Sequence, residues 1–371
     1  KTMHSVTVIA PGRINLIGEH TDYNNGFVLP AAIQYAACVT ISKREDNQVH
    51  LKAIDLNESL VIDALAVLQK TEIQWANYII GVIVQIAKNH PITTGFNLEI
   101  KSNVPIGAGL SSSAAIECAV AFGINELFAL GIEKMELALM AQKAEHDFAG
   151  VQCGIMDQFA SVFGKKDHVV LLDCQSMDYQ YFPLNLAGYQ IVLFDTGVKH
   201  ALANSEYNTR RQECEAGVQM IQSKYPAVKS LRDAIIQMLN ETVDAQNHQL
   251  IYNRCKYVIE EIERTYAATA DLKANQLKAF GEKMYATHKG LSELFQVSCH
   301  ELDVLINAVI DNPNVIGARM MGGGFGGCTI NIVKENQVQE IISSVAQQYL
   351  AQTGKALTHY TVTVQDGVRL I

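Results

Sequence analysis

Residues 104–115 read Val-Pro-Ile-Gly-Ala-Gly-Leu-Ser-Ser-Ser-Ala-Ala, a glycine- and serine-rich turn between two contrasting patterns. Before the turn, apolar and polar residues alternate from 95 to 104, which is typical of a β-strand. After it, residues 114–129 carry apolar side chains at helical spacing. The turn therefore places backbone N–H groups and three hydroxyls at the positive end of a helix dipole, where phosphate commonly binds. The alternative is an ordinary serine-capped helix behind a turn.

This turn differs from the two commonest phosphate-binding motifs. A P-loop carries Gly-Lys-Ser/Thr after its second glycine, and no lysine follows Gly109. A dinucleotide fingerprint needs a third glycine where Ser112 stands, followed by a second strand that carries an acidic residue. The sequence instead predicts another helix at residues 133–148. The turn is therefore a phosphate-binding loop of another type.

The 371 residues carry a net charge of −9, and 49% of them are hydrophobic and 18% charged. This length and composition predict a globular protein of two domains, which we place at residues 1–180 and 181–371. The negative charge argues against nucleic acid and anionic membrane as partners, and no segment is a good bilayer span. The eight cysteines form no Cys-x-x-Cys pair, so we expect reduced thiols and a cytoplasmic protein.

A second polar cluster lies near the start of the chain. Residues 13–23 hold seven side chains that can form hydrogen bonds with a ligand: Arg13, Asn15, Glu19, His20, Thr21, Asp22 and Tyr23. Carboxylates, an imidazole and a tyrosine beside a glycine suit the hydroxyl groups of a sugar. The alternative is a plain surface loop, although such a loop would not usually carry Leu16 and Ile17.

Two acidic residues farther along are candidates for a cation ligand and a catalytic base. Glu145 lies in Lys-Ala-Glu-His-Asp-Phe (143–148), an acidic helix end beside which a cation could bind, and a solvated helix end is the alternative. Asp157 follows two glycines and stands between Met156 and Phe159, so we expect its carboxylate to be partly buried. A buried aspartate rarely lacks a partner or a catalytic role.

Further strands and helices are predicted along the rest of the chain. We expect strands at 6–10, 27–44, 169–174, 190–195, 328–334 and 356–364, a hairpin at 49–62, a domain linker at 175–185, and helical patterns at 72–89, 205–312 and 337–351. Trp75, the only tryptophan, is a core residue or a platform for a nucleotide base. Residues 322–327, Gly-Gly-Gly-Phe-Gly-Gly, lead into a strand and form a flexible wall that can press against a loop or nucleotide.

Three stretches resemble the superfamily of galacto-, homoserine, mevalonate and phosphomevalonate kinases: residues 11–23, 105–114 and 322–328. The first is similar to the narrower galactokinase signature. Gly-Ile-Met-Asp-Gln (154–158) and Tyr-Asn-Thr-Arg-Arg (207–211) agree with that signature, and the resemblance covers almost the whole chain. Ala108 departs from the pattern, since some relatives carry glycine there. This change is mild unless the backbone needs a positive φ.

The resemblance implies a two-domain α+β fold with the active site in the cleft between the domains. It implies ATP-dependent phosphorylation of the anomeric hydroxyl of α-D-galactose, with Mg²⁺ as the metal and a monomer as the oligomeric state. The ATP phosphates would be bound by Gly107, Ala108, Gly109, Leu110, Ser111, Ser112 and Ser113. Trp75 would lie beside the adenine, and residues 322–327 would support the phosphate loop.

The same resemblance assigns roles around the sugar. Asp157 would be the catalytic base facing the anomeric hydroxyl, with Arg13 beside it to keep it ionised and to neutralise the transferring group. Ser113 and Glu145 would hold the Mg²⁺. The sugar would be bound by Glu19, His20, Asp22, Gly154 and Tyr207.

Two other functions are compatible with these motifs. One is a kinase for an N-acetylated or otherwise altered sugar, which no single residue here reveals. The other is a sensor that binds galactose and ATP without turnover. We expect such a sensor to have a damaged phosphate loop or base, whereas Ser113, Glu145 and Asp157 are all in place. The sequence therefore favours an enzyme.

Overall fold

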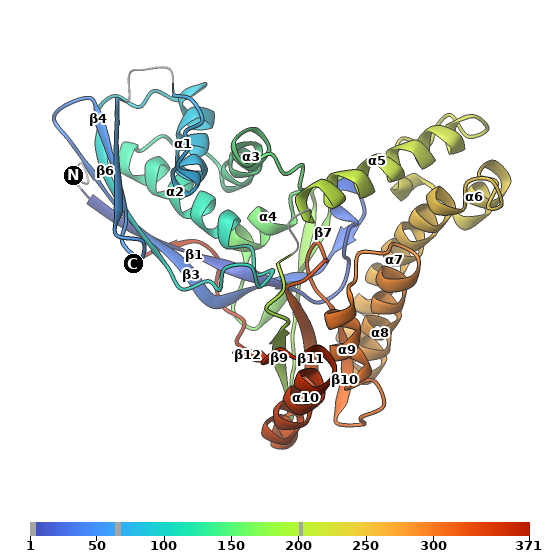
Figure 1. The fold of residues 1–371 in the computed structure, drawn as a ribbon. Helices are drawn as coiled ribbons and strands as arrows, with labels where there is room; N and C mark the ends of the chain where they lie inside the picture. Colours follow the sequence, from blue (N-terminus) through green and yellow to red (C-terminus); the bar gives the residue numbers. More distant parts are fainter. Residues whose placement is uncertain (1–4, 64–67, 200–202) are drawn as a thin grey trace.

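The computed structural model describes residues 5–63, 68–199 and 203–371, which mix helices and strands (Figure 1). A six-stranded sheet has the order β13-β1-β3-β6-β4-β5. Its strands are β1 (Ser5–Asn15), β3 (Pro30–Lys43), β4 (Gln48–Ala53), β5 (Glu58–Asp63), β6 (Phe96–Ser102) and β13 (Arg369–Leu370). Neighbouring strands are antiparallel, except that β4 and β6 run parallel.

Helices cover one face of this sheet (Figure 1). They are α1 (Gln74–Ala87), α2 (Ser112–Phe128), α3 (Lys134–Ala144) and α4 (Met156–Phe163). Helices α2 and α4 contact β1 and β3 directly, while α1 and α3 pack against α2. The alternation predicted before the phosphate loop is confirmed, because Phe96, Leu98 and Ile100 of β6 are buried.

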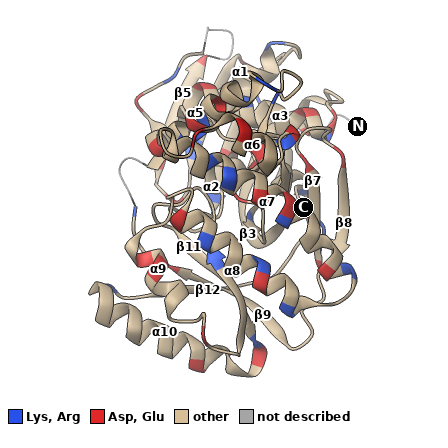
Figure 2. Cartoon of the chain, turned by 90° about the vertical axis from the view of Figure 1, so that its right-hand side faces the viewer, with Lys and Arg blue, Asp and Glu red and all other residues tan. Residues whose placement is uncertain are grey.

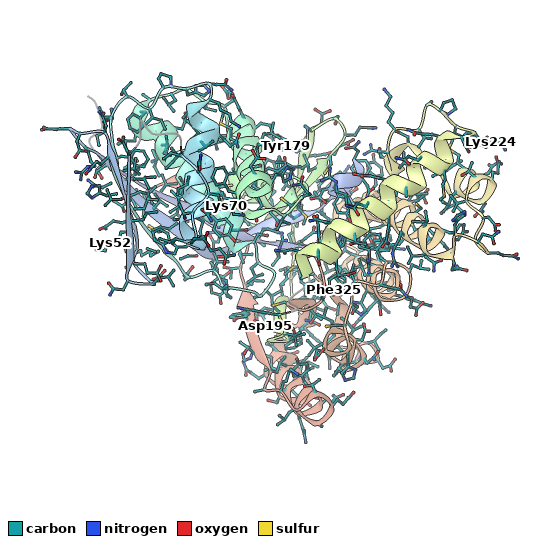
Figure 3. All side chains as sticks on the ribbon, turned by 45° about the horizontal axis from the view of Figure 1, so that its top comes forward. Lys52, Lys70, Tyr179, Asp195, Lys224 and Phe325 are labelled. Carbon is teal, nitrogen blue, oxygen red and sulfur yellow. The ribbon has the colours of Figure 1, made fainter. Side chains whose placement is uncertain are left out.

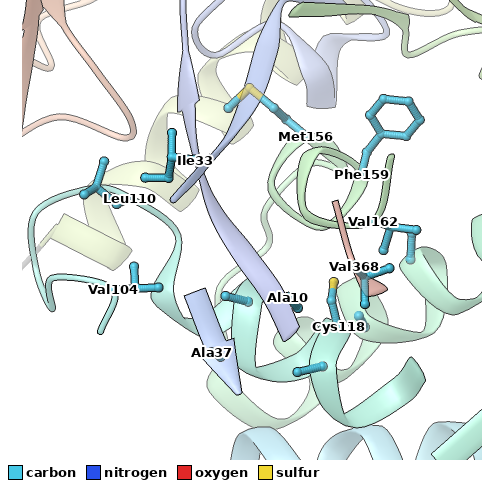
Figure 4. Close-up of a cluster of buried hydrophobic side chains, with 14 of the residues drawn as sticks. Ala10, Ile33, Ala37, Val104, Leu110, Cys118, Met156, Phe159, Val162 and Val368 are labelled. Carbon is cyan, nitrogen blue, oxygen red and sulfur yellow. The ribbon is translucent and has the colours of Figure 1, made fainter. Parts of the chain in front are cut away.

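The phosphate loop and the helix that carries Asp157 are anchored in one buried cluster (Figure 4). Leu110 of the loop and Cys118 of α2 contribute to it, and Met156 and Phe159 of α4 belong to the same cluster. Since protein interiors are close-packed, a shift of either segment would open space in this core. The two segments are therefore fixed relative to each other.

A four-stranded sheet of order β10-β11-β9-β12 lies below the first one in Figure 1. Its strands are β9 (Tyr189–Asp195), β10 (Val315–Met320), β11 (Cys328–Lys334) and β12 (Thr358–Val362), and α8 (Leu277–Glu293), α9 (His300–Asn307) and α10 (Val338–Thr353) pack against it. Ile191 and Ile330 on one face of this sheet belong to the same core as the first sheet. The core is thus continuous between the two sheets.

The remaining elements are a small sheet and a helical arm. The small sheet joins β2 (Phe27–Val28), β7 (His168–Asp173) and β8 (Tyr179–Pro183), and the arm consists of α5 (Ala203–Gln222), α6 (Ile236–Thr242) and α7 (Gln249–Lys273). Charged residues of both signs are interspersed on the helices of the face drawn in Figure 2. In the described parts of the chain, no helix is long and apolar enough to cross a membrane.

The α+β class and most elements predicted from the sequence are confirmed, with two corrections. The first strand does not end at residue 10. It runs to Asn15, because residues 13–15 continue to pair with β3 after a register shift. The stretch 175–185, which we expected to be the domain linker, is not without secondary structure, since β8 lies within it and pairs with β7. Buried Phe182 holds β8 against the core.

The domain division at residues 180 and 181 stays a prediction. The end of the chain returns to the first sheet, where Leu370 of β13 pairs with Val8 of β1. Val364 and Val368 belong to the core of that sheet. A boundary at residues 180 and 181 therefore assigns these last residues to the second domain, although they pack against the sheet of the first.

Helix α8 lies directly on β10 because two glycines face each other at the contact. A Cβ added to Gly281 would lie 2.0 Å from the carbonyl oxygen of Ile316, and one added to Gly317 would lie 2.5 Å from the Cα of Gly281. Contacts this short require a shift of backbone. The sequence shows no periodic signal for such an approach.

We expect Gly281→Ala to lower the free energy of unfolding by about 1–3 kcal/mol, the usual cost of overpacking. Helix propensity alone predicts the opposite sign, a gain of up to about 1 kcal/mol. Urea unfolding of both proteins measures the change. Gly123→Ala in α2 is the matched control, because its nearest neighbour is a side-chain carbon at 3.3 Å. Unchanged or increased stability of Gly281→Ala would contradict this account of the contact.

Candidate active site

Two cavities meet at the first turn of α2. The first has a volume of about 370 Å³ and is lined by the phosphate loop, the polar cluster of residues 13–23, residues 151–158 and the glycine-rich loop, together with Val198, Lys199, Ala203, Asn204 and Tyr207. The second, of about 650 Å³, is lined by Trp75, Tyr78, Ile106 and other mostly apolar residues. Ser113 lines both cavities. A ligand with an apolar ring and a polar chain can therefore reach from the second cavity into the first.

The phosphate loop adopts the turn that its glycines allow. Gly107 and Gly109 have φ angles of 76° and 77°, whereas Ala108 is not among the residues with positive φ. The alanine in place of glycine is therefore harmless, as the sequence suggested. Ser111 precedes α2 in a left-handed conformation, with φ of 61°. Its buried hydroxyl has no hydrogen-bond partner within the described ranges.

The glycine-rich loop, residues 322–327, lies against the phosphate loop, as the sequence suggested. A Cβ on Gly327 would lie 3.4 Å from the carbonyl oxygen of Ala108. On its other side the glycine-rich loop packs against Val297, since a Cβ on Gly324 would lie 2.1 Å from the carbonyl oxygen of Val297. The carbonyl oxygen of Gly327 accepts a hydrogen bond of 2.8 Å from the Thr196 hydroxyl. A side chain on Gly324 would therefore clash with the backbone of Val297, and both Gly324 and Gly327 have positive φ angles, of 93° and 77°, that favour glycine.

Arg13 joins the phosphate loop to Asp157. Its Nε donates to Oδ1 of Asp157 at 2.8 Å, and its Nη1 donates to the carbonyl oxygen of Gly109 at 2.6 Å. The Arg13 side chain is 4% exposed and that of Asp157 is 31% exposed, so the carboxylate is partly buried, as predicted. A charge-assisted hydrogen bond at this distance fixes the orientation of the carboxylate.

Asp22 lies next to Asp157 in the same cavity. Its carboxylate accepts hydrogen bonds from the backbone N–H groups of Tyr23, at 3.0 Å, and Met156, at 3.4 Å. Burial, and then the charge of Asp157, raise the pKa of Asp22 to about 6. Gly154 is required beside it, because an added Cβ would lie 2.0 Å from Oδ2 of Asp22.

His20 holds the polar cluster to the glycine-rich loop. Burial is the main reason why its pKa falls to about 4, so the ring is neutral at pH 7. The carbonyl oxygen of Gly323, 3.0 Å from Nε2, can only accept, so Nε2 carries the proton. Nδ1 then accepts from the hydroxyl of Tyr23 at 2.6 Å. Both ring nitrogens are thus engaged within the protein, and the ring lies 5.1 Å from that of Tyr207.

Glu19 binds a residue that the sequence analysis missed. Its Oε2 is 2.8 Å from Nη1 of Arg319 and accepts a hydrogen bond of 3.0 Å from the N–H of Gly322. Arg319 is fully buried and also donates to the carbonyl oxygens of Leu16 and Met320. The available signal was a single arginine within the otherwise uncharged stretch of residues 312–333. A buried charge of this kind needs a partner.

Glu145 is only 7% exposed, so the alternative of a solvated helix end is wrong. Its Oε2 has no hydrogen-bond partner among the residues described. The neighbouring Glu117 is fully buried, and burial followed by the charge of Glu145 raises the pKa of Glu117 well above its usual value.

Glu145 and Ser113 fit a Mg²⁺ ion whose remaining ligands are phosphate oxygens and water. Glu145 and the Ser113 hydroxyl, both in the first cavity, are hard oxygen donors of the kind that Mg²⁺ prefers. The described residues contain no group of three or more His, Cys, Asp or Glu side chains that could hold a metal alone. Mg²⁺ often relies on one or two protein oxygens together with phosphates and water.

Trp75 is half-buried in the wall of the second cavity, with part of its ring packed on the core. Its Nε1 donates to Oε2 of Glu58 at 2.6 Å, which fixes the ring orientation. The core contact that the sequence offered as one alternative is therefore present, and the role of Trp75 as a platform for a nucleotide base stays a prediction.

Known protein families match three parts of the chain. The galactokinase galactose-binding signature matches residues 2–43, the GHMP kinases N-terminal domain matches residues 77–165, and the GHMP kinases C-terminal domain matches residues 268–351. These segments contain the polar cluster, the phosphate loop and the glycine-rich loop described above.

Similar proteins cover almost the whole chain. A galactokinase of Thermosipho africanus is 42% identical over 364 residues, which are 98% of this chain and 99% of that protein. A galactokinase of Clostridium acetobutylicum is 41% identical over 98% of this chain and 94% of its own. The structure of Lactococcus lactis galactokinase complexed with galactose has a TM-score of 0.94 and 34% identity, covering 100% of this chain and 96% of its own. A mevalonate kinase structure with a TM-score of 0.63 and 17% identity shares the fold, covering 97% of this chain and 99% of its own.

We expect Asp22→Asn to stabilise the free protein at pH 7.5 by about 1–3 kcal/mol. With a raised pKa, the folded state binds a proton more tightly than the unfolded chain does. Ionised Asp22 therefore destabilises the fold above about pH 6, and this cost disappears as the pH falls toward 4. Urea unfolding at pH 7.5 and pH 5 should show a smaller gain at the lower pH.

The control for this prediction is Asp178→Asn, which removes a carboxylate from an exposed turn. It should change stability little at either pH. If Asp22→Asn does not increase the free energy of unfolding, or increases it equally at both pH values, then ionised Asp22 does not destabilise the fold.

Proposed function

The chain belongs to the galactokinase family of the GHMP kinases, and we propose that it transfers the terminal phosphoryl group of ATP to the anomeric hydroxyl of α-D-galactose. The products are galactose 1-phosphate and ADP. The observation that carries this proposal is the Arg13–Asp157 pair, which joins the phosphate loop to the polar cluster inside one cavity. The carboxylate that can accept a hydroxyl proton therefore lies next to the loop that can bind the phosphates.

Each substrate has a region whose chemistry suits it. The apolar second cavity suits the adenine, with Trp75 in its wall. The backbone N–H groups of residues 107–113 and the hydroxyls at the start of α2 suit the phosphates. The first cavity offers Asp22 and Tyr207 to the hydroxyls of the sugar. Ser113, at the junction, would lie beside the phosphate chain.

Transfer is mainly a matter of positioning and charge. The anomeric oxygen forms a bond to the γ-phosphorus, the bond from that phosphorus to the β–γ bridging oxygen breaks, and ADP leaves with the electron pair. Asp157 accepts the hydroxyl proton. Ser113 and Glu145 would hold the Mg²⁺, which when bound neutralises phosphate charge.

Arg13 acts mainly through Asp157. Its Nε and Nη1 are already engaged by the Asp157 carboxylate and the Gly109 carbonyl oxygen. It therefore holds the base in position relative to the loop. Three further N–H donors of Arg13 remain, one on Nη1 and two on Nη2, and they can neutralise the transferring group.

Asp22 is proposed to select galactose over its epimers. Galactose and glucose differ only in the direction of the fourth hydroxyl, so a pocket separates them by a polar group that only one of them satisfies. The carboxylate of Asp22 is fixed by two backbone N–H groups and is ionised above about pH 6. It can therefore accept hydrogen bonds from hydroxyls in a defined direction.

We further propose a cytoplasmic monomer with the domain division at residues 180 and 181. The eight cysteines are free thiols in the structure, which suits a reducing compartment. Sedimentation of the purified protein would test the monomer.

The experiment that tests the function is a coupled assay of ADP release against galactose, glucose, N-acetylgalactosamine, mevalonate and homoserine. Phosphorus NMR of the product identifies the phosphorylated hydroxyl. We expect galactose to be the preferred acceptor, phosphorylated at the anomeric position. Turnover of another acceptor in preference to galactose, or binding of galactose and ATP without ADP release, would overturn the proposal.

We expect Asp157→Asn to lower kcat by about 10²–10⁴, the usual effect of losing a general base. Asparagine can still accept from Nε of Arg13, so galactose binding in the absence of nucleotide should change little. Steady-state kinetics and calorimetry give the two quantities. Asp178→Asn, in an exposed turn, serves as the control and should be fully active. A kcat within a few-fold of the parent would make Asp157 a structural residue.

We expect Glu145→Gln to raise the Mg²⁺ concentration that gives half-maximal activity, because it removes an anionic ligand from the ion. Titration of activity with Mg²⁺ at fixed ATP measures this. Glu136→Gln removes an exposed carboxylate at the other end of α3 and should leave the titration unchanged. Superimposable curves for Glu145→Gln and the parent would exclude Glu145 as a metal ligand.

A further inference from the structure

The motif Tyr-Asn-Thr-Arg-Arg at residues 207–211 places only some of its side chains at the first cavity. Tyr207 lines this cavity, whereas Asn208 and Arg211 lie outside its lining among the described residues. Asn208 and Arg211 are three positions apart in α5, so they lie on the same face of the helix. Both are only partly exposed, which indicates that this face packs against another part of the chain.

The partner of this helix face is the backbone of Gln152. The N–H of Gln152 donates to Oδ1 of Asn208 at 3.3 Å, and its carbonyl oxygen accepts from Nη1 of Arg211 at 2.9 Å. We call these two hydrogen bonds the Gln152 clamp. Because Gln152 is an exposed residue, its backbone groups could bind water instead. What the clamp adds is a fixed position of this residue against α5.

Gln152 belongs to residues 150–154, a short irregular segment that forms part of the cavity wall. The segment touches Asp22, because a Cβ added to Gly154 would lie 2.0 Å from Oδ2 of that carboxylate. A small displacement of the segment would therefore change the space around Asp22. The residues of the segment that line the first cavity are Val151, Cys153 and Gly154.

The same segment is held from its other side by α3 and the turn that follows this helix. The carbonyl oxygen of Cys153 accepts from Nε2 of Gln142 at 3.1 Å and from Nε2 of His146 at 2.7 Å. A carbonyl oxygen can only accept, so Nε2 of His146 carries a proton. Residues 150–154 are therefore bonded to α3 on one side and to α5 on the other.

Helix α5 belongs to a different part of the molecule from α3. It extends from near Phe325 of the glycine-rich loop outward to Lys224, just beyond its far end (Figure 3). Cys214 of α5 packs in the cluster of the helical arm, whereas Ala141 of α3 packs in the core of the first sheet. The clamp on residues 150–154 therefore joins two parts of the molecule whose apolar clusters are separate.

Arg211 also contacts the polar cluster of residues 13–23. The carbon of its guanidinium lies 5.9 Å from the centroid of the Tyr23 ring, within the range of a cation–π contact. The Tyr23 ring lies 5.4 Å from that of Tyr207, edge to face. One arginine outside the cavity thus contacts both the segment that carries Gly154 and the cluster that carries Asp22.

We propose that Arg211 and Asn208 are positioning residues that set the separation of Gly154 and Tyr207 across the sugar region of the first cavity. This inference rests on the proposed kinase function. Neither residue contacts a substrate. The clamp holds residues 150–154 so that Asp22 and Tyr207 reach the hydroxyls of one sugar molecule together. A misplacement of about 1 Å in such a site can lower the rate about 10²-fold.

The test compares Arg211→Met and Asn208→Ala with the parent, since each variant removes one hydrogen bond of the clamp. We expect Arg211→Met to lower kcat/KM for galactose by about 10- to 100-fold, mainly through a higher KM. Calorimetry without nucleotide should show a parallel loss of galactose affinity. The KM for ATP should stay within a few-fold of the parent value. Asn208→Ala should act in the same direction but more weakly, because its hydrogen bond is longer and uncharged.

Two further variants test whether both side chains act through Gln152. Asn208→Asp keeps an oxygen that can accept from the N–H of Gln152, so it should restore most of the affinity lost in Asn208→Ala. The double variant Arg211→Met/Asn208→Ala should lose less than the product of the two single losses, because both bonds hold one residue. A loss equal to or greater than that product, or no rescue by Asn208→Asp, would overturn the proposal.

The matched control is Glu215→Gln. Glu215 is the exposed ion-pair partner of Nε of Arg211, at 3.4 Å, and its loss leaves the bond from Nη1 to Gln152 in place. Its galactose kinetics should equal those of the parent. Equal weakening of galactose and of the ATP analogue AMP-PNP by Arg211→Met would indicate a general structural role and overturn the inference. The kinase proposal itself fails only if the parent does not phosphorylate galactose, so the two failures are distinguishable.

Discussion

The buried ion pair between Arg319 and Glu19 is the constraint on which the site depends. Arg319 is fully buried in β10, and Glu19 belongs to the polar cluster at the other end of the chain. The guanidinium of Arg319 also donates to the carbonyl oxygens of Leu16 and Met320. Oε2 of Glu19 accepts a further hydrogen bond from the N–H of Gly322. Loss of either partner would leave a buried charge uncompensated, at a cost of about 3–5 kcal/mol. The pair therefore fixes the polar cluster against the glycine-rich loop.

Because the Arg319–Glu19 ion pair holds the polar cluster to the glycine-rich loop, the loops at the site can pack together without large side chains of their own. The glycine-rich loop presses on the phosphate loop through backbone contacts, such as that of Gly327 with Ala108. Arg13 then links the phosphate loop to Asp157. These connections leave backbone N–H groups and carboxylates facing the cavity. Holding the carboxylates close together in a buried site is electrostatically unfavourable, and the raised pKa of Asp22 is one sign of this. Such a site is prepared for ligands that are rich in hydroxyls and negative charge.

The sequence predicted the elements that carry local signals. Alternation before residue 104 gave β6, helical spacing after it gave α2, and the transition from residue 327 into a strand gave β11. Glycines next to polar residues marked the loops of the site. The predictions that were wrong concern positions that long-range contacts decide. Residues 13–15 extend β1 because β3 lies beside them, and β8 forms because β7 is available to pair with it.

The sequence by itself determined the fold class, the family and the set of polar groups at the site, because periodicity and motifs are local properties of the chain. Only the tertiary structure decided how those groups are used. It showed that Glu145 is buried, that both nitrogens of His20 are engaged, and that Arg319 and Arg211 hold the segments around the site. Residue 319 is 300 positions from residue 19, and residue 211 is 59 positions from residue 152. A pairing of that kind leaves no trace in local spacing, since it arises only when separate segments pack around a common core.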